Sequence, residues 1–219
     1  MIKVSYEVHS ARWHIQKCLQ RLQKVPMMSF DTETRGVYTP AERQEAKDYL
    51  KQENIPVNGK TLALQVANNS GLSFPTLVNV THFVFGLTED SSVIIICETP
   101  QLEKIIWNWI AQYPGKLLVH NTLYDLKIMY SRIGRFPIDY EDTAILAKCL
   151  TNHSSTWKAK VGLKDLMGSH YDPAWTLMDD YEPINLKDPG FLMYAGIDGA
   201  ATVKLWNDIQ EHLEGEESD

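Results

Sequence analysis

The sequence has little of what marks secreted, membrane-bound and nucleotide-binding proteins. It has only three cysteines, Cys18, Cys97 and Cys149, and no C-x-x-C pair, so no disulfide framework and a reducing compartment are expected. The N-terminus lacks the apolar stretch of a signal peptide, and the longest strongly apolar run, Val93–Cys97, is far too short to cross a bilayer. No G-x-G-x-x-G, P-loop or G-x-S-x-G motif occurs. These absences predict a cytoplasmic protein with no membrane partner.

The chain also lacks an excess of basic residues. It has 21 Lys and Arg against 28 Asp and Glu, a net charge of −7, but six of these acids and no base lie in the last twelve residues. The remaining 22 acids and 21 bases give a net charge of −1, which excludes no class of partner. With 219 residues, of which 44% are hydrophobic, we expect one packed domain over residues 1–213 and an acidic tail over 214–219.

Apolar periodicity and capping signals predict alternating strands and helices, as in an α/β or α+β fold. The expected strands are Met27–Glu33, Thr61–Ala67, Thr81–Leu87, Ser92–Cys97 and Lys116–His120. The expected helices are Ser10–Lys24, Thr39–Asn54, Thr99 to about Tyr113, Leu123–Ile133, Thr143–Leu150, Leu163–Ser169 and Asp188–Leu213. The polar helix Thr39–Asn54 belongs to an insertion over about residues 38–60.

Two carboxylates stand at the end of the first predicted strand. Asp31 and Glu33 are two apart, so both side chains point to the same side of a strand. Most D-x-E triplets lie on solvated surface, but this one directly follows the apolar run MMSF. Like charges held side by side are unfavourable unless a cation compensates them. The pair therefore indicates a candidate metal site.

Two further candidate acids belong to predicted helices in the second half of the sequence. Asp125 follows the strand LLVH and falls in the first turn of the next helix, where a capping role is the simpler interpretation. Tyr194 and Asp198 are four apart and share one face of the last helix. Each feature alone is ordinary. Their order along the chain, D-x-E, then H-N-x-x-x-D, then Y-x-x-x-D, is specific.

With these motifs the sequence resembles the 3′–5′ exonuclease domain of family A DNA polymerases, within the DEDD superfamily. The segments FDTET, HNTLYD and YAGID match its three motifs, EDTAILAKCL resembles its D-T segment, and VGLKDLMGSHY resembles its L-K-D-L helix. Tyr194 marks the tyrosine type, because the histidine type would place His where this chain has Met193. The resemblance implies a ribonuclease-H-like (DnaQ-like) fold, a central mixed β-sheet flanked by helices. The H-N opening of the second motif looks bacteriophage-like, which implies a bacterial or phage-infected host cytoplasm.

The resemblance also implies a two-metal mechanism. Two divalent cations about 4 Å apart would neutralise the phosphate and generate hydroxide, and oxygen ligands favour Mg²⁺ or Mn²⁺. Asp31 would bridge both ions. Glu33 and Asp198 would hold the ion that activates water, and Asp125 would support the other through water. Tyr194 would orient the attacking water, because a phenol with a pKa of about 10 stays protonated at neutral pH.

Substrate contacts follow from the same resemblance. Thr34 and Asn121 align with positions near the terminal nucleotide, and Val37 aligns with an apolar wedge between the last two bases, which Tyr38 would either replace or assist. Such a wedge stacks on bases without reading sequence, as expected for single-stranded ends. The run TWKAKVGLK, which includes Lys164, either guides the phosphate backbone or forms a solvated loop.

The sequence leaves several functions open. The first expectation is an exonuclease that releases nucleoside monophosphates from single-stranded DNA 3′ ends, for proofreading or DNA processing. No polymerase domain follows in these 219 residues, so its partner would be a separate DNA polymerase subunit, or the chain would act alone or be a fragment. The alternatives are a ribonuclease-D-like exoribonuclease and a non-catalytic module that binds nucleic acid or tethers a polymerase.

Overall fold

The computed structural model describes residues 4–35, 79–153, 161–170 and 185–216, together with residues 44, 47, 48, 51 and 52. The predicted strand Thr61–Ala67 and most of the insertion at 38–60 lie outside the described residues, as do Val37 and Tyr38. None of the described helices is both long and apolar enough to cross a membrane.

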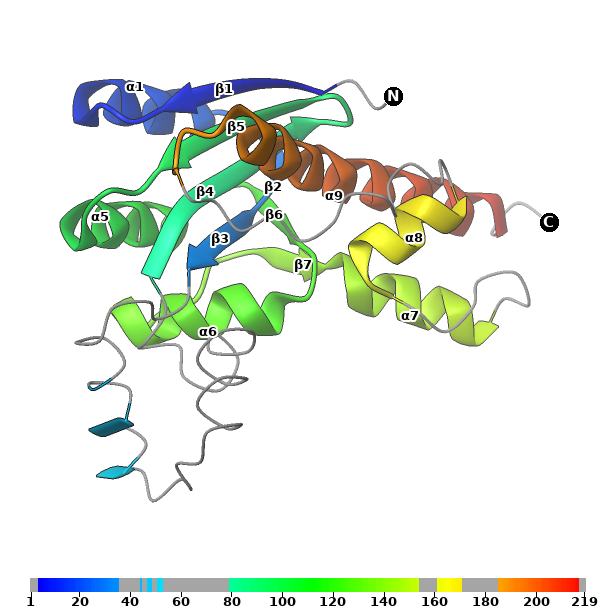
Figure 1. Cartoon of the computed structure of the whole chain (residues 1–219). Coiled ribbons are helices and arrows are strands. Elements are labelled where there is room, and N and C mark those ends of the chain that lie inside the picture. The colour runs from blue at the N-terminus through cyan, green and yellow to red at the C-terminus, as the bar shows by residue number, and fades with distance from the viewer. Residues whose placement is uncertain are drawn as a thin grey trace.

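Strands and helices alternate through most of the described chain (Figure 1). The strands are β1 (Ser5–His9), β2 (Met27–Ser29), β3 (Asp31–Arg35), β4 (Asn79–Thr88), β5 (Ser91–Ile96), β6 (Lys116–Val119) and β7 (Tyr140–Asp142). The helices are α1 (Arg12–Leu22), α5 (Pro100–Ile110), α6 (Thr122–Ile133), α7 (Thr143–His153), α8 (Leu163–His170) and α9 (Pro189–Glu216). Three helix ends are capped: Thr99 Oγ1 accepts a hydrogen bond from Leu102 N before α5, Gly134 adopts φ 64° after α6, and Asp188 Oδ1 accepts from Phe191 N before α9.

The strands form two hydrogen-bonded sheets, and the chain passes from one to the other at Phe30, between β2 and β3. A four-stranded sheet has the order β1-β5-β4-β3, and a three-stranded parallel sheet has the order β2-β6-β7. In the first sheet β1 is parallel to β5, whereas β3 and β5 are antiparallel to β4. The predicted mixed sheet flanked by helices is thus confirmed. β1 and β7 were not predicted; β1 is a largely exposed edge strand without a regular apolar alternation.

The prediction of one strand over Met27–Glu33 is wrong in one respect. The segment breaks at Phe30, so β2 pairs with β6 while β3 pairs with β4 in the other sheet. Phe30 itself is buried, and its backbone N donates to the carbonyl oxygen of Leu118. Apolar residues continue across the break because both sheets pack into one core, and periodicity alone therefore gives no sign of it.

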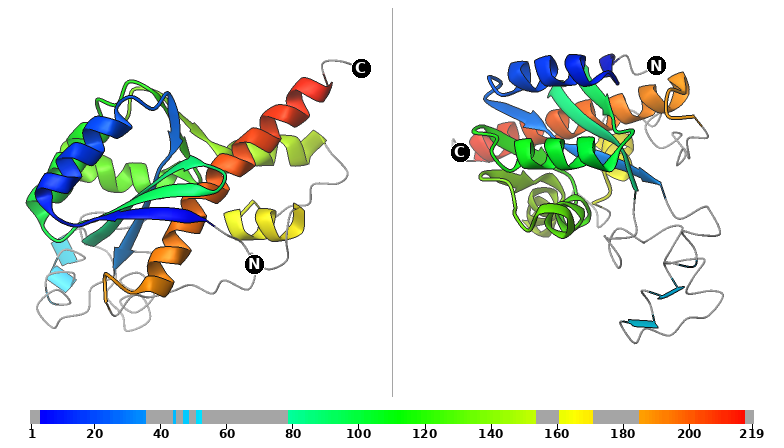
Figure 2. Two further views of the ribbon diagram at one scale, coloured as in Figure 1. Left: turned by 90° about the horizontal axis from the view of Figure 1, so that it is seen from above. Right: turned by 90° about the vertical axis from the view of Figure 1, so that its left-hand side faces the viewer.

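Helices cover the two faces of the four-stranded sheet. Phe83, Phe85 and Ile95 point to the face covered by α1 and α5, whereas Val84 and Ile94 point to the face covered by α9. Seen from above, α9 crosses the strands as one long helix (Figure 2, orange to red). Of the acids predicted from the sequence, Asp31, Glu33 and Asp198 belong to the α9 face.

Candidate active site

Asp31 and Glu33 point from β3 toward the face of the sheet that α9 covers. They pair in register with Val84 and His82 of β4, and the register shifts directly after Glu33. Thr81 Oγ1 donates to the backbone oxygen of Glu33 at 3.0 Å, which fixes the strand at this irregularity. Both acids of the D-x-E triplet therefore project from one rigid edge, as the alternation predicts.

Asp198 reaches the same place from α9. One ligand oxygen from each of Asp31, Glu33 and Asp198 can be chosen so that all three lie within 4.8 Å of one another. The helix comes this close because two glycines face each other where it crosses β4. A Cβ atom on Gly86 would lie 2.2 Å from the backbone oxygen of Gly199. A side chain at this crossing would thus push α9, and Asp198 with it, away from β3.

Two buried serines hold α9 at this crossing. Ser29 Oγ donates to the carbonyl oxygen of Gly199 at 2.7 Å and accepts from Gly86 N at 2.9 Å. Ser92 Oγ donates to the carbonyl oxygen of Gly196 at 2.6 Å. These contacts lie on both sides of Asp198 in the sequence, so they fix the position from which its carboxylate extends.

Asp125 lies beside the three clustered acids and is held by β3. Its side chain is only 2% exposed. Its Oδ1 accepts hydrogen bonds from Thr32 N at 3.0 Å and from Thr32 Oγ1 at 2.5 Å. Asp125 is in the first turn of α6, as predicted. Its contacts with Thr32 tie α6 to the residue between Asp31 and Glu33, a role that the capping interpretation does not include.

Burial and neighbouring charges raise the pKa of two of these acids, Asp31 and Asp125. Burial and the charges of Asp125, Glu33 and Asp198 hold the pKa of Asp31 well above its usual range. Burial, together with the charge of Asp142, raises the pKa of Asp125 to about 7, although its hydrogen bonds with Thr32 oppose the rise. A divalent cation would remove this repulsion, and carboxylate oxygens are the donors that Mg²⁺ and Mn²⁺ prefer. The donor set therefore fits a divalent metal.

Tyr194 lies one helical turn before Asp198 and contacts Lys164 of α8. Lys164 Nζ is 2.6 Å from the phenol oxygen and 4.2 Å from the ring centroid. Burial, followed by the charges of Asp198, Glu33 and Asp31, raises the pKa of Tyr194, so the phenol is protonated at neutral pH. Of the basic residues in the run TWKAKVGLK, the structure describes Lys164, and its ammonium belongs to the site.

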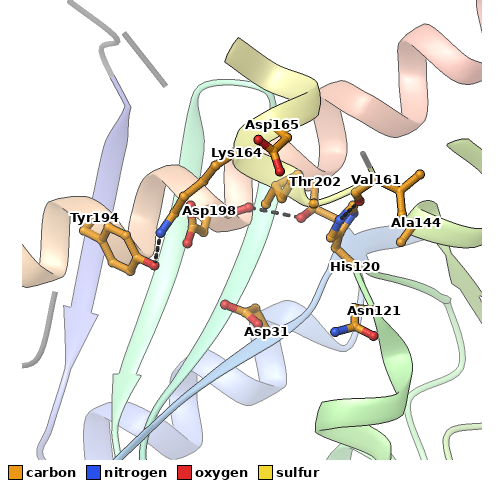
Figure 3. Close-up of a pocket in the computed structure, with 12 residues that line it drawn as sticks. Asp31, His120, Asn121, Ala144, Val161, Lys164, Asp165, Tyr194, Asp198 and Thr202 are labelled. Carbon is orange, nitrogen blue, oxygen red and sulfur yellow. Dashed lines mark hydrogen bonds between the residues drawn. The ribbon is translucent and has the colours of Figure 1, made fainter. Parts of the chain in front are cut away.

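A cavity of about 620 Å³ opens beside the acids (Figure 3). Its polar lining includes Asp31, Asp198, Tyr194, Lys164 and Asn121. Figure 3 shows Lys164 and Tyr194 on one side of Asp198 and Asn121 on the side of α6. The volume suits a small organic ligand of nucleotide size.

The wall near Asn121 is shaped by the turn between β6 and α6. Asn121 adopts φ 65°, the left-handed region that non-glycine residues rarely enter. The preceding His120 donates from Nε2 to the carbonyl oxygen of Val161 at 2.8 Å, and its Nδ1 lies 2.9 Å from Thr143 Oγ1. Burial lowers the pKa of His120. This neutral side chain joins the turn to the segment that leads into α8.

Asp142 is a supporting residue whose position the motif analysis did not identify. Its carboxylate accepts hydrogen bonds from the backbone N of Asn121 at 3.1 Å, Thr122 at 2.8 Å, Ala144 at 2.8 Å and Ile145 at 3.3 Å, and from Thr122 Oγ1 at 2.7 Å. Burial opposes ionisation, but these bonds outweigh it and lower the pKa of Asp142. The signal was present in the segment EDTAIL, which resembles the family's D-T segment.

Thr34, the other predicted substrate residue on β3, is half-buried. Its Oγ1 lies 2.5 Å from the phenol oxygen of Tyr124 on α6. The structure therefore brings Asp31, Glu33 and Asp198 together, with Asp125 and Tyr194 beside them. Thr34 lies on β3 next to Glu33, and Asn121 lies in the turn directly before α6. Val37 lies outside the described residues.

The same fold occurs in solved nuclease structures. NrnC from Brucella melitensis, with bound Mg²⁺, superposes with a TM-score of 0.57 at 13% identity, covering 98% of this chain and 83% of NrnC; another NrnC structure is bound to pGG. RNase D from Escherichia coli, an exoribonuclease, gives 0.54 at 13% identity, covering 97% of this chain and 46% of that enzyme. The EXO domain of Nibbler from Aedes aegypti gives 0.56 at 14% identity, covering 96% and 89%.

No family model and no curated protein matches the sequence. The chain spans about half the length of RNase D. The structural neighbours give it the ribonuclease-H-like fold of DEDD-type exonucleases. These neighbours do not support the finer resemblance to polymerase proofreading domains. That resemblance stays a prediction.

Proposed function

We propose that this chain is a two-metal-ion 3′–5′ exonuclease that hydrolyses single strands to nucleoside monophosphates. The observation that carries the proposal is the approach of Asp31, Glu33 and Asp198 to within 4.8 Å beside an open cavity. Burial and the neighbouring carboxylates hold the pKa of Asp31 well above its usual range, so a cation is needed for these acids to be ionised together. The fold shared with a Mg²⁺-bound nuclease supports the same conclusion.

Each site residue has a proposed role in the reaction. When bound, two divalent ions supply charge neutralisation and a hydroxide nucleophile. Asp31 would bridge them, Glu33 and Asp198 would hold the ion near the water, and Asp125 would support the other ion through water, as the resemblance implies. The direct contact between Asp125 and Thr32 supports an indirect role, in which Asp125 acts on the metal ion through water.

The other residues act on water and substrate. The protonated phenol of Tyr194 orients the attacking water, and the Lys164 ammonium at 2.6 Å keeps the phenol oxygen in place while facing the phosphate. Thr34 and Asn121 hold the terminal nucleotide, and Val37 separates the last two bases. Lys164 and Tyr194 both line the cavity, which supports their joint contact with one substrate.

The proposed substrate is the 3′ end of single-stranded DNA, because the three motifs resemble those of proofreading domains. A separate DNA polymerase is the proposed partner. A second candidate is a ribonuclease-D-like activity on RNA, which is favoured by the fold shared with an exoribonuclease and with a nuclease bound to pGG. The 2′-hydroxyl is the chemical difference that separates these substrates.

Release of labelled mononucleotide from matched DNA and RNA strands tests the proposal. With Mn²⁺, the wild type is expected to release mononucleotide from a 3′-labelled DNA strand faster than from RNA, and Asp31→Ala is expected to release none. Preference for RNA would assign the second candidate. Equal binding by both proteins without release by either would show a non-catalytic binding module.

A further inference from the structure

Helix α1 presents a surface of one charge on the side of the molecule away from the carboxylates. The segment from Arg12 to Lys24 contains four basic residues and no acid. Its apolar residues Ile15, Cys18, Leu19 and Leu22 are buried in the core. Only the polar face of the helix is therefore available to a partner.

The C-terminal half of this helix lines a shallow cavity of about 690 Å³. The lining consists of Lys17, Gln20, Arg21, Gln23 and Lys24, which we call the α1 groove. Cationic and amide side chains are the groups that proteins use to contact phosphate and sugar oxygens. All five are exposed side chains in the described structure.

Most of the positive charge in the α1 groove is not neutralised within the described structure. Arg21 is bound by Glu7 of β1, with Nη2 2.6 Å from Oε2. No ion pair joins Lys17 or Lys24 to an acid among the described residues. Lys17 instead lies over the ring of Trp13, with Nζ 4.3 Å from its centroid, and that indole is 62% exposed. The surface thus combines two cations with an accessible aromatic ring, the pairing that single-strand binding proteins use.

We infer that the α1 groove binds the phosphate backbone of a long single-stranded substrate, away from the end that is cleaved. This inference rests on the proposed nuclease function and adds a second contact to it. Because α1 and α9 cover opposite faces of the sheet, a dinucleotide at the carboxylates does not reach the groove, whereas a longer strand passes around the sheet edge. A membrane surface fits less well, because the apolar face of α1 is already buried and cannot insert.

The test compares two double variants that remove the same charge. Lys17→Gln with Lys24→Gln neutralises the α1 groove and leaves the Arg21–Glu7 pair in place. Lys104→Gln with Lys148→Gln neutralises two exposed lysines on α5 and α7 as a control. Binding of a strand of about 16 nucleotides, the upper end of common single-strand site sizes, is measured in EDTA at several salt concentrations. Hydrolysis of a dinucleotide is measured with Mn²⁺, and thermal unfolding checks folding.

For the groove variant we expect weaker strand binding and unchanged dinucleotide hydrolysis. Each phosphate contact on a single strand contributes about 0.7 to the slope of log affinity against log salt, so two lost contacts lower it by about 1.4. Between about 50 and 200 mM salt the affinity of the variant should therefore change about seven-fold less than that of the wild type. The control variant should match the wild type.

Equal salt slopes in the two double variants would overturn the inference. So would loss of dinucleotide hydrolysis in the groove variant alone, because the lysines would then act through the fold. If the groove variant instead lost binding to vesicles containing phosphatidylserine and kept strand binding, the surface would be assigned to membranes. Failure of the wild type to cleave a dinucleotide would count against the proposed function, while the binding measurement would still report on the groove.

Discussion

The two faces of the four-stranded sheet carry charges of opposite sign. On one face, Asp198 of α9 meets Asp31 and Glu33 of β3. On the other, α1 presents Lys17 and Lys24 beside a groove without an acid in its lining. Both helices pack on the same strands through alternate residues, so one sheet separates the two charged surfaces.

The difference between the faces is how tightly the charged groups are held. The acids extend from a paired strand and from a helix fixed by the Gly86–Gly199 crossing, and the charges of the neighbouring acids, together with burial, raise the pKa of Asp31. The lysines of α1 stand in solvent on flexible side chains. Fixed charges of one sign suit chelation of a cation, whereas mobile charges suit a polymer whose phosphates can be contacted in many ways. The net charge of −7 conceals this separation.

The largest effect is expected from neutralising one of the three clustered acids, Asp198. Asp198→Asn removes a carboxylate from the metal site, and because a metal ion contributes several kcal/mol to such reactions, activity should fall about a thousand-fold. The rate of mononucleotide release measures it. Asp208→Asn, on the same helix but outside the cavity lining, is the control. Comparable losses in both variants would refute a special role for Asp198.

Lys164 is a positive charge beside the clustered acids on the α9 face. Removing this charge tests whether the two faces of the sheet use their lysines differently. A hydrogen bond from a charged donor is worth about 1.5–3 kcal/mol, so Lys164→Met should lower kcat roughly 10- to 100-fold. Lys164→Arg should retain more activity because it keeps a charged donor. In a Tyr194→Phe background the loss from Lys164→Met should shrink, since the two side chains act together. Full additivity of the two losses would contradict a shared role.

The hydrogen bonds that Asp142 accepts can be weakened without changing the clustered acids. Asp142→Asn replaces one accepting oxygen by a donor that faces backbone N–H groups, and leaving such groups unpaired costs about 1–3 kcal/mol. Urea unfolding should show this loss of stability. Asp139→Asn removes an exposed charge nearby and should leave the free energy of unfolding nearly unchanged. Equal effects would mean that charge, and not the hydrogen bonds of Asp142, matters.

The smallest expected effect concerns the metal-free protein. The folded pKa of Asp125, about 7, lies above the unfolded value of 3.8, so the folded state keeps this proton longer. Stability from this group is full below about pH 4 and declines as the pH rises through about 7. Asp125→Asn, which retains an accepting oxygen for Thr32, should remove at least about 1 kcal/mol of that decline. Denaturant unfolding in EDTA from about pH 4 to 8 measures it. An identical pH profile for wild type and variant would contradict the raised pKa that burial gives Asp125.

Local patterns account for much of the site. Alternation on a strand placed Asp31 beside Glu33, and helical spacing placed Tyr194 one turn before Asp198. The features that sequence patterns missed depend on contacts far apart in the chain. The break at Phe30 follows from two sheets sharing one core, and the role of Asp142 depends on a turn about twenty residues earlier in the chain.

The position of Lys164 shows the same limit. The basic run around it was equally consistent with a solvated loop, and only the packing of α8 against α9 brings its ammonium to Tyr194. The α1 groove was not predicted for a different reason. Its residues are ordinary for an amphipathic helix, and their meaning depends on the absence of acids from the groove lining, which only the folded surface reveals.

Anomalous diffraction from crystals soaked in Mn²⁺ tests the metal centre most directly. The account predicts two peaks about 4 Å apart, bounded by the carboxylates of Asp31, Glu33 and Asp198, and their loss in Asp198→Asn crystals. A soaked wild-type crystal with Mn²⁺ bound elsewhere and none between these three side chains would contradict it.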